Sequence, residues 1–440
     1  MKITYTNGYY EGEVRNGLKH GKGTYKWNNG DRYEGQWKDD KCNGQGIYYF
    51  RSGSRYEGQF KDGLFNGQGT MYHLNGGRYE GQFKDDKCNG QGIYYFNSGN
   101  RYEGQFVNGK FNGRGIFYFV NGDRYVGQFK DDLFNGQGTM YYAMGDKYEG
   151  QWKDDKRNGQ GIYYFNSGNR YEGLFVNGKF NGRGIFYFVN GNRYEGQFKD
   201  DLFNGQGTMY HVNGGRYEGQ FKDDKCNGQG VYYFSNGDKY EGPWVNNVRT
   251  GQGTYYFVGG NRYEGLFVNG KFNGQGIFYF ANGDRYVGQF KDDLFNGQGT
   301  MYHLNGGRYE GQWKDDKCNG QGVYYFNNGD KYEGAWVNNV RTGQGIYCFA
   351  NGDTYEGEFA DNRFDGYGVV DYSSKGERYA GEWRKGKYNG SGTLYLNDGS
   401  KITAIWQDGE VFKGQKYNAD GTTEELTKIS ESEGTNETEF

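Results

Sequence analysis

Hydrophobic and polar side chains alternate along this chain in a pattern that recurs every 23 residues. In the unit that opens at Tyr33, residues 33–38 place rings or glycine at every second position and polar side chains between them. This period of two predicts a strand with one aromatic face and one polar face. Residues 39–44 have turn chemistry, and residues 46–50 predict a second strand that is apolar on both faces. Each unit is therefore predicted to be one β-hairpin, and residues 52–54 are predicted to turn the chain back into the next unit at Tyr56.

The unit begins with Tyr-Glu-Gly and repeats from one end of the chain almost to the other. The series opens at Tyr10, keeps its register to Tyr355, gains one residue before Tyr379 and decays around Ile402. A fixed period of this length is typical of an array in which each unit contacts only its neighbours. We therefore predict an all-β fold, an elongated, twisted, solenoid-like array of antiparallel β-hairpins in a single sheet.

This pattern divides the chain into four segments. Residues 1–9 are predicted to form an N-terminal lead-in strand, and residues 10–401 about 17 tandem repeats of 23 residues. Residues 402–418 read as a degenerate capping repeat, which arrays need to cover the last hairpin. Residues 419–440 are acidic and rich in Thr and Ser, so we expect a disordered tail.

Composition agrees with an array of short strands. The chain has 83 glycines but one proline, and 20% of its residues are aromatic. Turn glycines such as the one in Asn121-Gly122 supply a positive φ, and Asn-Gly is a strong hairpin signal. Glycines inside strands, such as Gly35 and Gly46, leave space for a ring to lie on the backbone. Pro243 lies in a predicted strand and should mark a bulge, an edge or a kink.

A second tyrosine recurs 16 residues after the opening tyrosine in thirteen consecutive units. We call these residues the ladder tyrosines: Tyr49, Tyr72, Tyr95, Tyr118, Tyr141, Tyr164, Tyr187, Tyr210, Tyr233, Tyr256, Tyr279, Tyr302 and Tyr325. One interpretation is a structural stack of rings. The other is an exposed aromatic track that contacts a partner, and on this reading the ladder tyrosines are the candidate interaction site.

Charge and cysteine usage exclude some functions and suggest a compartment. The net charge is −3, and an array without a basic face predicts no nucleic-acid partner. Cys42, Cys88, Cys226 and Cys318 share one unit position, so they lie too far apart to form disulfides. No signal peptide and no long apolar run follow Met1. We therefore expect a cytoplasmic protein, and association with the cytoskeleton or a membrane surface stays open.

The residue types that carry catalysis are scarce. His73, His211 and His303 occupy one unit position where Phe is usual, so we interpret them as ring substitutes rather than ligands. Paired carboxylates such as Asp39-Asp40 lack the calcium-loop pattern, and the Gly-x-Gly pairs lack a P-loop lysine. The sequence thus predicts no enzyme, no catalytic residue, no metal site and no cofactor.

The repeated Tyr-Glu-Gly-Gln-Trp/Phe-Lys motif, followed by Asn-Gly-x-Gly and a glycine-containing turn, resembles the MORN (membrane occupation and recognition nexus) repeat. The resemblance covers roughly residues 10–400, although Val126 and Val287 replace the glutamate. It implies a twisted antiparallel array that acts as a scaffold in cytoskeletal, ciliary or membrane-junction assemblies. Some members of the family dimerise and some contact phospholipids. A protein partner is therefore expected, and a homodimer and an anionic phospholipid remain open.

Three functions are weighed on this basis. The first is a non-enzymatic scaffold or protein-interaction array that organises a cytoskeletal or membrane-apposed assembly. The alternative is peripheral phospholipid (phosphoinositide) binding through recurring turn lysines, for which the candidate residues are Lys38, Lys41, Lys61, Lys84 and Lys87. Interspersed aspartates cancel much of their field. Glycan binding by the ring ladder is the third, although glycan-binding arrays of this kind are normally exported.

Overall fold

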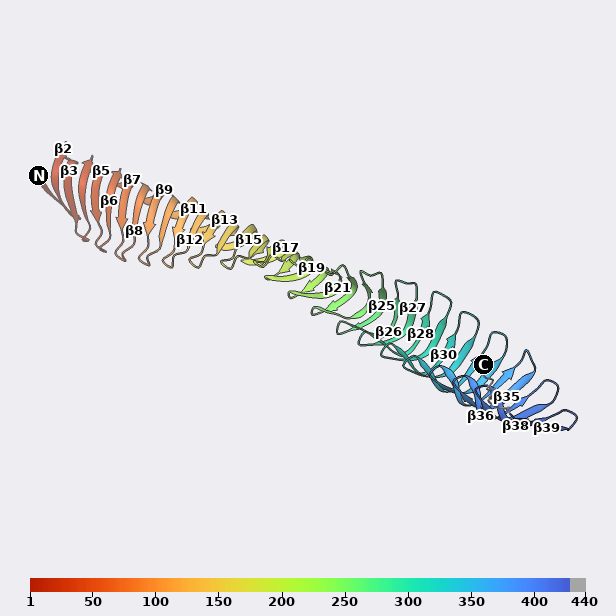
Figure 1. Ribbon diagram of the computed structural model, residues 1–440. Helices are drawn as coiled ribbons and strands as arrows, with labels where there is room; N and C mark the ends of the chain where they lie inside the picture. The colour runs from red at the N-terminus through yellow and green to blue at the C-terminus, as the bar shows by residue number, and fades with distance from the viewer. Residues whose placement is uncertain (428–440) are drawn as a thin grey trace, which may run out of the picture. The chain divides into compact units, whose positions relative to one another are not determined.

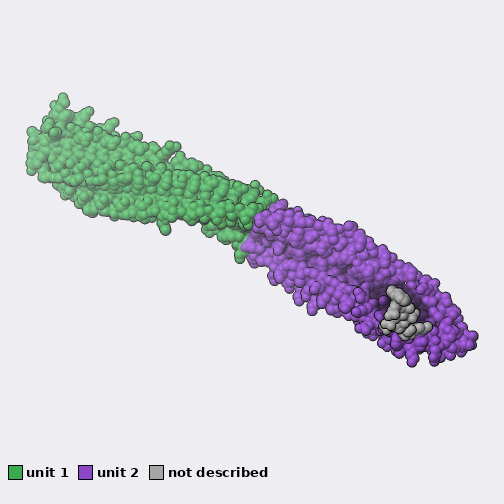
Figure 2. All heavy atoms as spheres, viewed as in Figure 1, with its two compact units in different colours: residues 1–225 green, residues 226–440 purple. Residues whose placement is uncertain are grey.

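The computed structural model describes residues 1–427, and within them all regular structure is β. The chain divides into two units, Met1–Lys225 and Cys226–Phe440 (Figure 2). Strands of the first unit are β1 (Lys2–Tyr5), β2 (Gly8–Arg15), β3 (Leu18–Trp27), β4 (Arg32–Lys38), β5 (Lys41–Tyr49), β6 (Arg55–Lys61), β7 (Leu64–Tyr72), β8 (Arg78–Lys84), β9 (Lys87–Tyr95), β10 (Arg101–Val107), β11 (Lys110–Tyr118), β12 (Arg124–Lys130), β13 (Leu133–Tyr141), β14 (Lys147–Lys153), β15 (Lys156–Tyr164), β16 (Arg170–Val176), β17 (Lys179–Tyr187), β18 (Arg193–Lys199), β19 (Leu202–Tyr210) and β20 (Arg216–Lys222).

The second unit continues the series, with its first strand beginning at the last residue of the first unit. Its strands are β21 (Lys225–Tyr233), β22 (Lys239–Val245), β23 (Val248–Arg249), β24 (Gly251–Tyr256), β25 (Arg262–Val268), β26 (Lys271–Tyr279), β27 (Arg285–Lys291), β28 (Leu294–Tyr302), β29 (Arg308–Lys314), β30 (Lys317–Tyr325), β31 (Lys331–Val337), β32 (Val340–Cys348), β33 (Thr354–Ala360), β34 (Arg363–Tyr372), β35 (Glu377–Arg384), β36 (Lys387–Tyr395), β37 (Lys401–Gln407), β38 (Glu410–Tyr417) and β39 (Thr423–Thr427).

Within each unit, strands pair antiparallel with their neighbours in chain order, as Figure 1 shows. In the hairpin of β4 and β5, Tyr33 lies opposite Tyr48 and Gly35 opposite Gly46. Strand β5 then pairs with β6, so that Tyr48 also lies opposite Tyr56. The predicted all-β class and the hairpin order are confirmed.

The turn inside each hairpin is tighter than the sequence suggested. Asp39 and Asp40 both have positive φ, 47° and 64°, and the chain re-enters the sheet at Lys41. Two successive positive φ values are typical of the two-residue turn that matches strand twist. The prediction that residues 39–44 form the turn is therefore wrong at its C-terminal side. Asn43 and Gly44 belong to the second strand, where Gly44 adopts a φ of 93°.

The Asn-Gly pairs lie in the wider connection between hairpins. Between β11 and β12, the N–H of Phe119 donates to the carbonyl of Asp123, and the N–H of Gly122 donates to the carbonyl of Phe119. This five-residue connection contains Asn121-Gly122, with Gly122 at a φ of 94°. The pair is thus a turn signal, as predicted, but the shortest turn of the repeat is the Asp-Asp turn.

A β-bulge interrupts each hairpin just after the strand glycine. In β4 and β5 the register shifts between Gly35 and Trp37, which leaves Gln36 outside the ladder, and its side chain accepts the N–H of Gln45 at 2.8 Å. Pro243 occupies the same position in β22, and its carbonyl accepts the N–H of Thr250. A residue without an N–H is tolerated at a bulge, so the predicted bulge at Pro243 is confirmed.

The opening tyrosines form the core on one face, which we call the ring face. Tyr33 is 0% exposed, and its hydroxyl donates to the carbonyl of Gln36 at 2.9 Å. A Cβ on Gly35 or Gly46 would lie within 2.4 Å of that hydroxyl. Only glycine leaves the ring room at these two positions, which confirms the predicted role of the strand glycines. Trp37 packs edge-on against Tyr33, with ring centroids 5.1 Å apart.

The two ends of the array differ in detail from the predicted segments. Residues 1–9 contain β1 and the start of β2, which form a hairpin, rather than one lead-in strand. The degenerate capping repeat consists of β37 and β38. The predicted tail at 419–440 is wrong at its beginning, because β39 pairs with β38 and Glu425 lies opposite Gln415. Strand pairing accepts an acidic segment whose alternate residues face solvent. The rest of the predicted tail, residues 428–440, lies outside the described residues.

Candidate functional site

The face opposite the ring face carries the ladder tyrosines, and we call it the ladder face. In the hairpin of β6 and β7, Arg55 lies directly opposite Tyr72, and its guanidinium is stacked 4.4 Å from the ring centroid. The Nε of Arg55 lies 2.8 Å from a carboxylate oxygen of Glu57, two residues further along β6. Each such repeat therefore presents a triad of a base, a tyrosine and a glutamate.

The triad recurs in both units with little change. The distance from the cation to the ring centroid ranges from 4.1 Å for Arg32 over Tyr49 to 4.6 Å for Arg285 over Tyr302. All ladder tyrosines are half-buried except Tyr141 and Tyr302, which are 38% and 36% exposed. The rings thus alternate with cations from adjacent strands and remain partly exposed to solvent.

The ladder face of the second unit contains a shallow, open depression of about 700 Å³. Its walls are polar at one end, where Glu241 and Glu264 lie, and apolar at the other, where Ile277 and Val287 lie opposite each other. Strand glycines form part of its lining through their backbone, because a Cβ at these positions would point to the ring face. The depression is open to solvent rather than enclosed.

The lysines that the sequence proposed as lipid-facing gather at one edge of the first unit. Lys38 and Lys41 lie opposite each other and flank the Asp39-Asp40 turn, and both are exposed. Lys84 and Lys87 form the equivalent pair, while Lys61 lies opposite Leu64. Each lysine pair is thus placed beside two carboxylates of its own turn, which reduces the local positive potential.

The same edge holds successive repeats together. The side chain of Asp86 accepts the backbone N–H of Phe65 in the preceding repeat at 2.7 Å, and the N–H of Asp86 donates to the carbonyl of Phe65. At Gly178 and Gly270, where glycine replaces this aspartate, Arg157 and Arg249 of the preceding repeats each donate to the glycine carbonyl at 2.7 Å. The turn aspartates therefore have a structural role.

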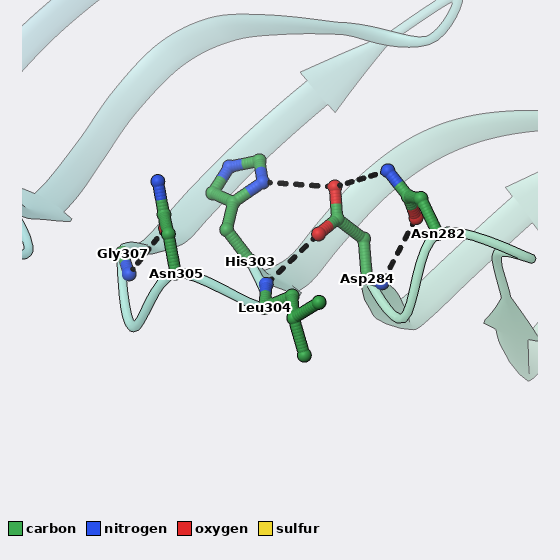
Figure 3. Close-up of polar contacts among 6 residues, drawn as sticks. All are labelled: Asn282, Asp284, His303, Leu304, Asn305 and Gly307. Atoms are coloured by element: carbon green, nitrogen blue, oxygen red, sulfur yellow. Dashed lines mark hydrogen bonds and ion pairs between the residues drawn. The ribbon is translucent and has the colours of Figure 1, made fainter.

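The opposite edge has a second hydrogen-bonded contact between repeats, which we call a clip and which Figure 3 shows. The carboxylate of Asp284 accepts the N–H of Leu304 at 2.9 Å and lies 3.2 Å from Nδ1 of His303. The N–H of Leu304, ahead of the other contacts, lowers the pKa of Asp284 below its usual value. Asp238, which is equivalent to Asp284 two repeats earlier, accepts a hydrogen bond from the hydroxyl of Tyr255. His303 thus contacts a carboxylate but forms part of no metal cluster among the residues that the structure describes.

Sequence reasoning found the ladder tyrosines but missed the residues that surround them. In most repeats a base precedes the opening tyrosine and a glutamate follows it, and this recurrence every 23 residues is the signal that could have identified the triad. Sequence reasoning selected lysines as lipid-facing candidates because of their charge. The cations that contact the ladder tyrosines are mostly arginines such as Arg55 and Arg101.

The cysteine thiols and the histidine rings are buried or half-buried. Burial raises the pKa of the Cys42 thiol to about 12 and that of Cys88 to about 11, so both remain protonated. The cysteines are free, as predicted. Burial lowers the pKa values of His73 and His211. Over residues 1–427 no helix has the length and apolar character to cross a membrane.

Tandem hairpins of about 23 residues, each stabilised by the next, define a β-repeat protein. The sequence profile of the MORN repeat matches seventeen segments, which run in register from 10–32 to 355–377 and end with 379–401. The chain belongs to the MORN repeat family. Repeats of this family in general mediate interactions with proteins or membranes.

Similarity to individual proteins adds little to this assignment. No curated protein matches the chain. Among solved structures, the TCP10 domain of Danio rerio CPAP in complex with a peptide of Danio rerio STIL is similar, with 13% identity over 55% of this chain and 97% of that chain and a TM-score of 0.27. The Drosophila melanogaster SAS-4 (dCPAP) TCP domain, in complex with a proline-rich motif of Ana2 (dSTIL), has 16% identity over 40% and 85%, with a TM-score of 0.19. These low TM-scores support no argument about this chain.

Proposed function

We propose that this chain is a non-enzymatic scaffold, a protein-interaction array that organises a cytoskeletal or membrane-apposed assembly in the cytoplasm. The observation that carries the proposal is the recurrence of one half-exposed triad, a base stacked on a ladder tyrosine and paired with a glutamate, in repeat after repeat. Many equivalent weak contacts give high avidity when a partner engages several of them together.

The chemistry of the ladder face favours a protein partner. Tyrosine and arginine are the residues that dominate protein interfaces, because a rigid ring and a planar cation bury area with little loss of entropy. In the first unit the triads of Arg55, Arg78 and Arg101 are each neutralised by a glutamate, so the face has little net field. A surface of this kind discriminates by shape and hydrogen bonding rather than by charge.

The test is affinity capture of the tagged full chain from cells, with mass spectrometry, beside a liposome flotation assay. The matched variant replaces Tyr49, Tyr72 and Tyr95 by Ser on the ladder face, and the control replaces the exposed Leu74 by Ser. We expect specific proteins that the ladder variant fails to recover and the control retains. Recovery of the same proteins by the ladder variant would contradict the proposal.

Phosphoinositide binding is the second candidate, favoured by the exposed lysine pairs at the Asp-turn edge, where each lysine near an anionic surface contributes about 1 kcal/mol. The adjacent carboxylates oppose it. Flotation with phosphoinositide vesicles at physiological salt, abolished by changing Lys38, Lys41, Lys84 and Lys87 to Gln, would support it. Absence of flotation would exclude it.

A further inference from the structure

Among the bases that precede the opening tyrosines of the seventeen matched repeats, two lack the ion pair that the others form on the ladder face. At Arg124 in the first unit and Arg285 in the second, the base is stacked on its ladder tyrosine as elsewhere, at 4.5 Å and 4.6 Å. The glutamate that neutralises the base in neighbouring repeats is replaced by Val126 and by Val287. Neither guanidinium has an ion-pair partner within residues 1–427, whereas Arg262, one repeat before Arg285, lies 3.0 Å from Glu264.

The two positions have the same surroundings. Val126 lies between Ile116 and Thr139, and Arg124 lies opposite Tyr141. Val287 lies between Ile277 and Thr300 in the same arrangement, and Arg285 lies opposite Tyr302. Tyr141 and Tyr302 are the two most exposed ladder tyrosines. Each position therefore combines an uncompensated cation, an exposed ring and a small apolar patch.

We propose that these two positions are carboxylate-binding stations for an extended peptide partner, which places an Asp or Glu side chain on the guanidinium and an apolar side chain on the valine. The inference rests on the proposed function and specifies the chemistry of the partner. The chain itself supplies the template, because Glu264 shows how a carboxylate contacts Arg262 beside a stacked ring.

The charge pattern of the ladder face favours a peptide rather than a membrane as the occupant. One unpaired cation in a neutralised ladder gives little attraction to anionic lipid. In the second unit the apolar end of the shallow depression is formed by Ile277 and Val287, and Val287 lies on the same strand as Arg285. A charge-assisted contact between a guanidinium and a carboxylate is strong and directional.

The decisive variant gives each unpaired arginine a carboxylate partner and removes no cation. Val287→Glu and Val126→Glu restore the residue that most repeats have, so that each arginine gains a carboxylate from its own strand. The fold tolerates this change because the neighbouring repeats already contain it. The converse variant, Glu264→Val, leaves Arg262 unpaired and creates a third station in the adjacent repeat.

The experiment selects binders from a phage-displayed library of random 12-residue peptides on the intact wild-type chain. We expect enrichment of peptides with an Asp or Glu beside an apolar residue, a loss of affinity of about tenfold or more on the Val126→Glu/Val287→Glu variant, and a gain on Glu264→Val. Affinity should fall as salt rises.

Three outcomes would overturn the inference: enrichment without acidic residues, equal binding to the wild-type and double-glutamate chains, or no enriched peptide. In each case the scaffold proposal is judged separately, because affinity capture with the ladder-tyrosine variant does not depend on these two stations. Val126→Glu and Val287→Glu chains that recover the same proteins as the wild type would show that the ladder works without them.

Discussion

The two faces of the sheet use tyrosine in opposite ways, as two residues of one repeat show. Tyr56 on the ring face is 0% exposed, lies over two glycines and donates its hydroxyl to the carbonyl of Gln59 at 2.9 Å. Tyr72 on the ladder face is half-buried and lies beneath the guanidinium of Arg55. The first tyrosine is fixed by steric fit and a buried hydrogen bond, whereas the second is held by a contact that also faces solvent. A single layer of strands can therefore separate the side chains that stabilise it from the side chains that it presents to solvent.

The largest expected effect comes from filling the space beneath a buried ring. An alanine Cβ at Gly69 would lie 2.4 Å from the Tyr56 hydroxyl, so Gly69→Ala should displace the ring and destabilise the fold by about 3 kcal/mol. Chemical denaturation of the full chain measures the change. Gly63→Ala is the control, because that turn glycine has open space around it and should lose only about 1 kcal/mol through its φ of 91°.

Removing one tyrosine hydroxyl from each face should destabilise the fold less than Gly69→Ala does. The loss in the free energy of unfolding should again be larger on the ring face than on the ladder face. Tyr56→Phe leaves the carbonyl of Gln59 without its buried donor and should cost about 1–2 kcal/mol. Tyr72→Phe keeps the ring on which Arg55 stacks and should change stability by less than about 0.5 kcal/mol. Equal losses in the two denaturation midpoints would refute the assignment of the faces.

The repeat-to-repeat contact at the Asp-turn edge should come next in size. Asp86→Ala removes the acceptor for the N–H of Phe65 and should destabilise the chain by about 1 kcal/mol. Asp86→Asn keeps an oxygen acceptor, as Asn247 does for the N–H of Cys226, and should be close to wild type. Amide hydrogen exchange at Phe65 should accelerate in the alanine variant alone; unchanged exchange there would contradict the clip.

The ion pair of the ladder triad should contribute least to the free energy of unfolding at ordinary salt concentrations. Arg55 and Glu57 are 39% and 37% exposed at the side chain, so Glu57→Gln should lower stability by only about 0.3 kcal/mol, and added salt should reduce the difference. A loss above about 1 kcal/mol that persists in high salt would show that the ladder face is structural.

Low pH should weaken the contact between Asp284 and Leu304 that joins two repeats at the other edge. The folded pKa of Asp284 is lowered, chiefly by the N–H of Leu304, so its stabilising contribution is present above the unfolded-state pKa of about 3.9 and is lost as pH falls through the folded value. Asp284→Asn should therefore flatten the decline in stability below about pH 4. A decline as steep as that of the wild type in this variant would exclude the contribution of Asp284.

The hairpin repeat could be predicted because local alternation and a fixed period are both visible along the chain. The exact turn could not, because Asn43-Gly44 carries a stronger turn signal than Asp39-Asp40, and only the pairing of Lys38 with Lys41 decides between them. The contact of Asp284 with Leu304 joins residues 20 positions apart on neighbouring repeats. Such contacts between repeats depend on the register in which neighbouring strands pair. The sequence of a single repeat does not define that register.

The beginning of the predicted tail shows the same limit. Acidic composition predicted disorder from residue 419, but β39 gains the hydrogen bonds of a sheet edge that β38 already presents. The ladder tyrosines could be identified from their spacing. Their environment required the neighbouring strand, because Arg55 and Tyr72 are 17 residues apart in the sequence and directly opposite in the hairpin.

The most direct test of the separation of the two faces is denaturant unfolding of two triple variants of the first unit in the full chain. One replaces Tyr33, Tyr56 and Tyr79 on the ring face by Ala, and the other replaces Tyr49, Tyr72 and Tyr95 on the ladder face by Ala. We predict that the ring-face variant loses about 3 kcal/mol or more per site and unfolds this region, while the ladder-face variant remains folded, with a loss of about 1 kcal/mol per site or less. Similar losses in the two variants would contradict the account.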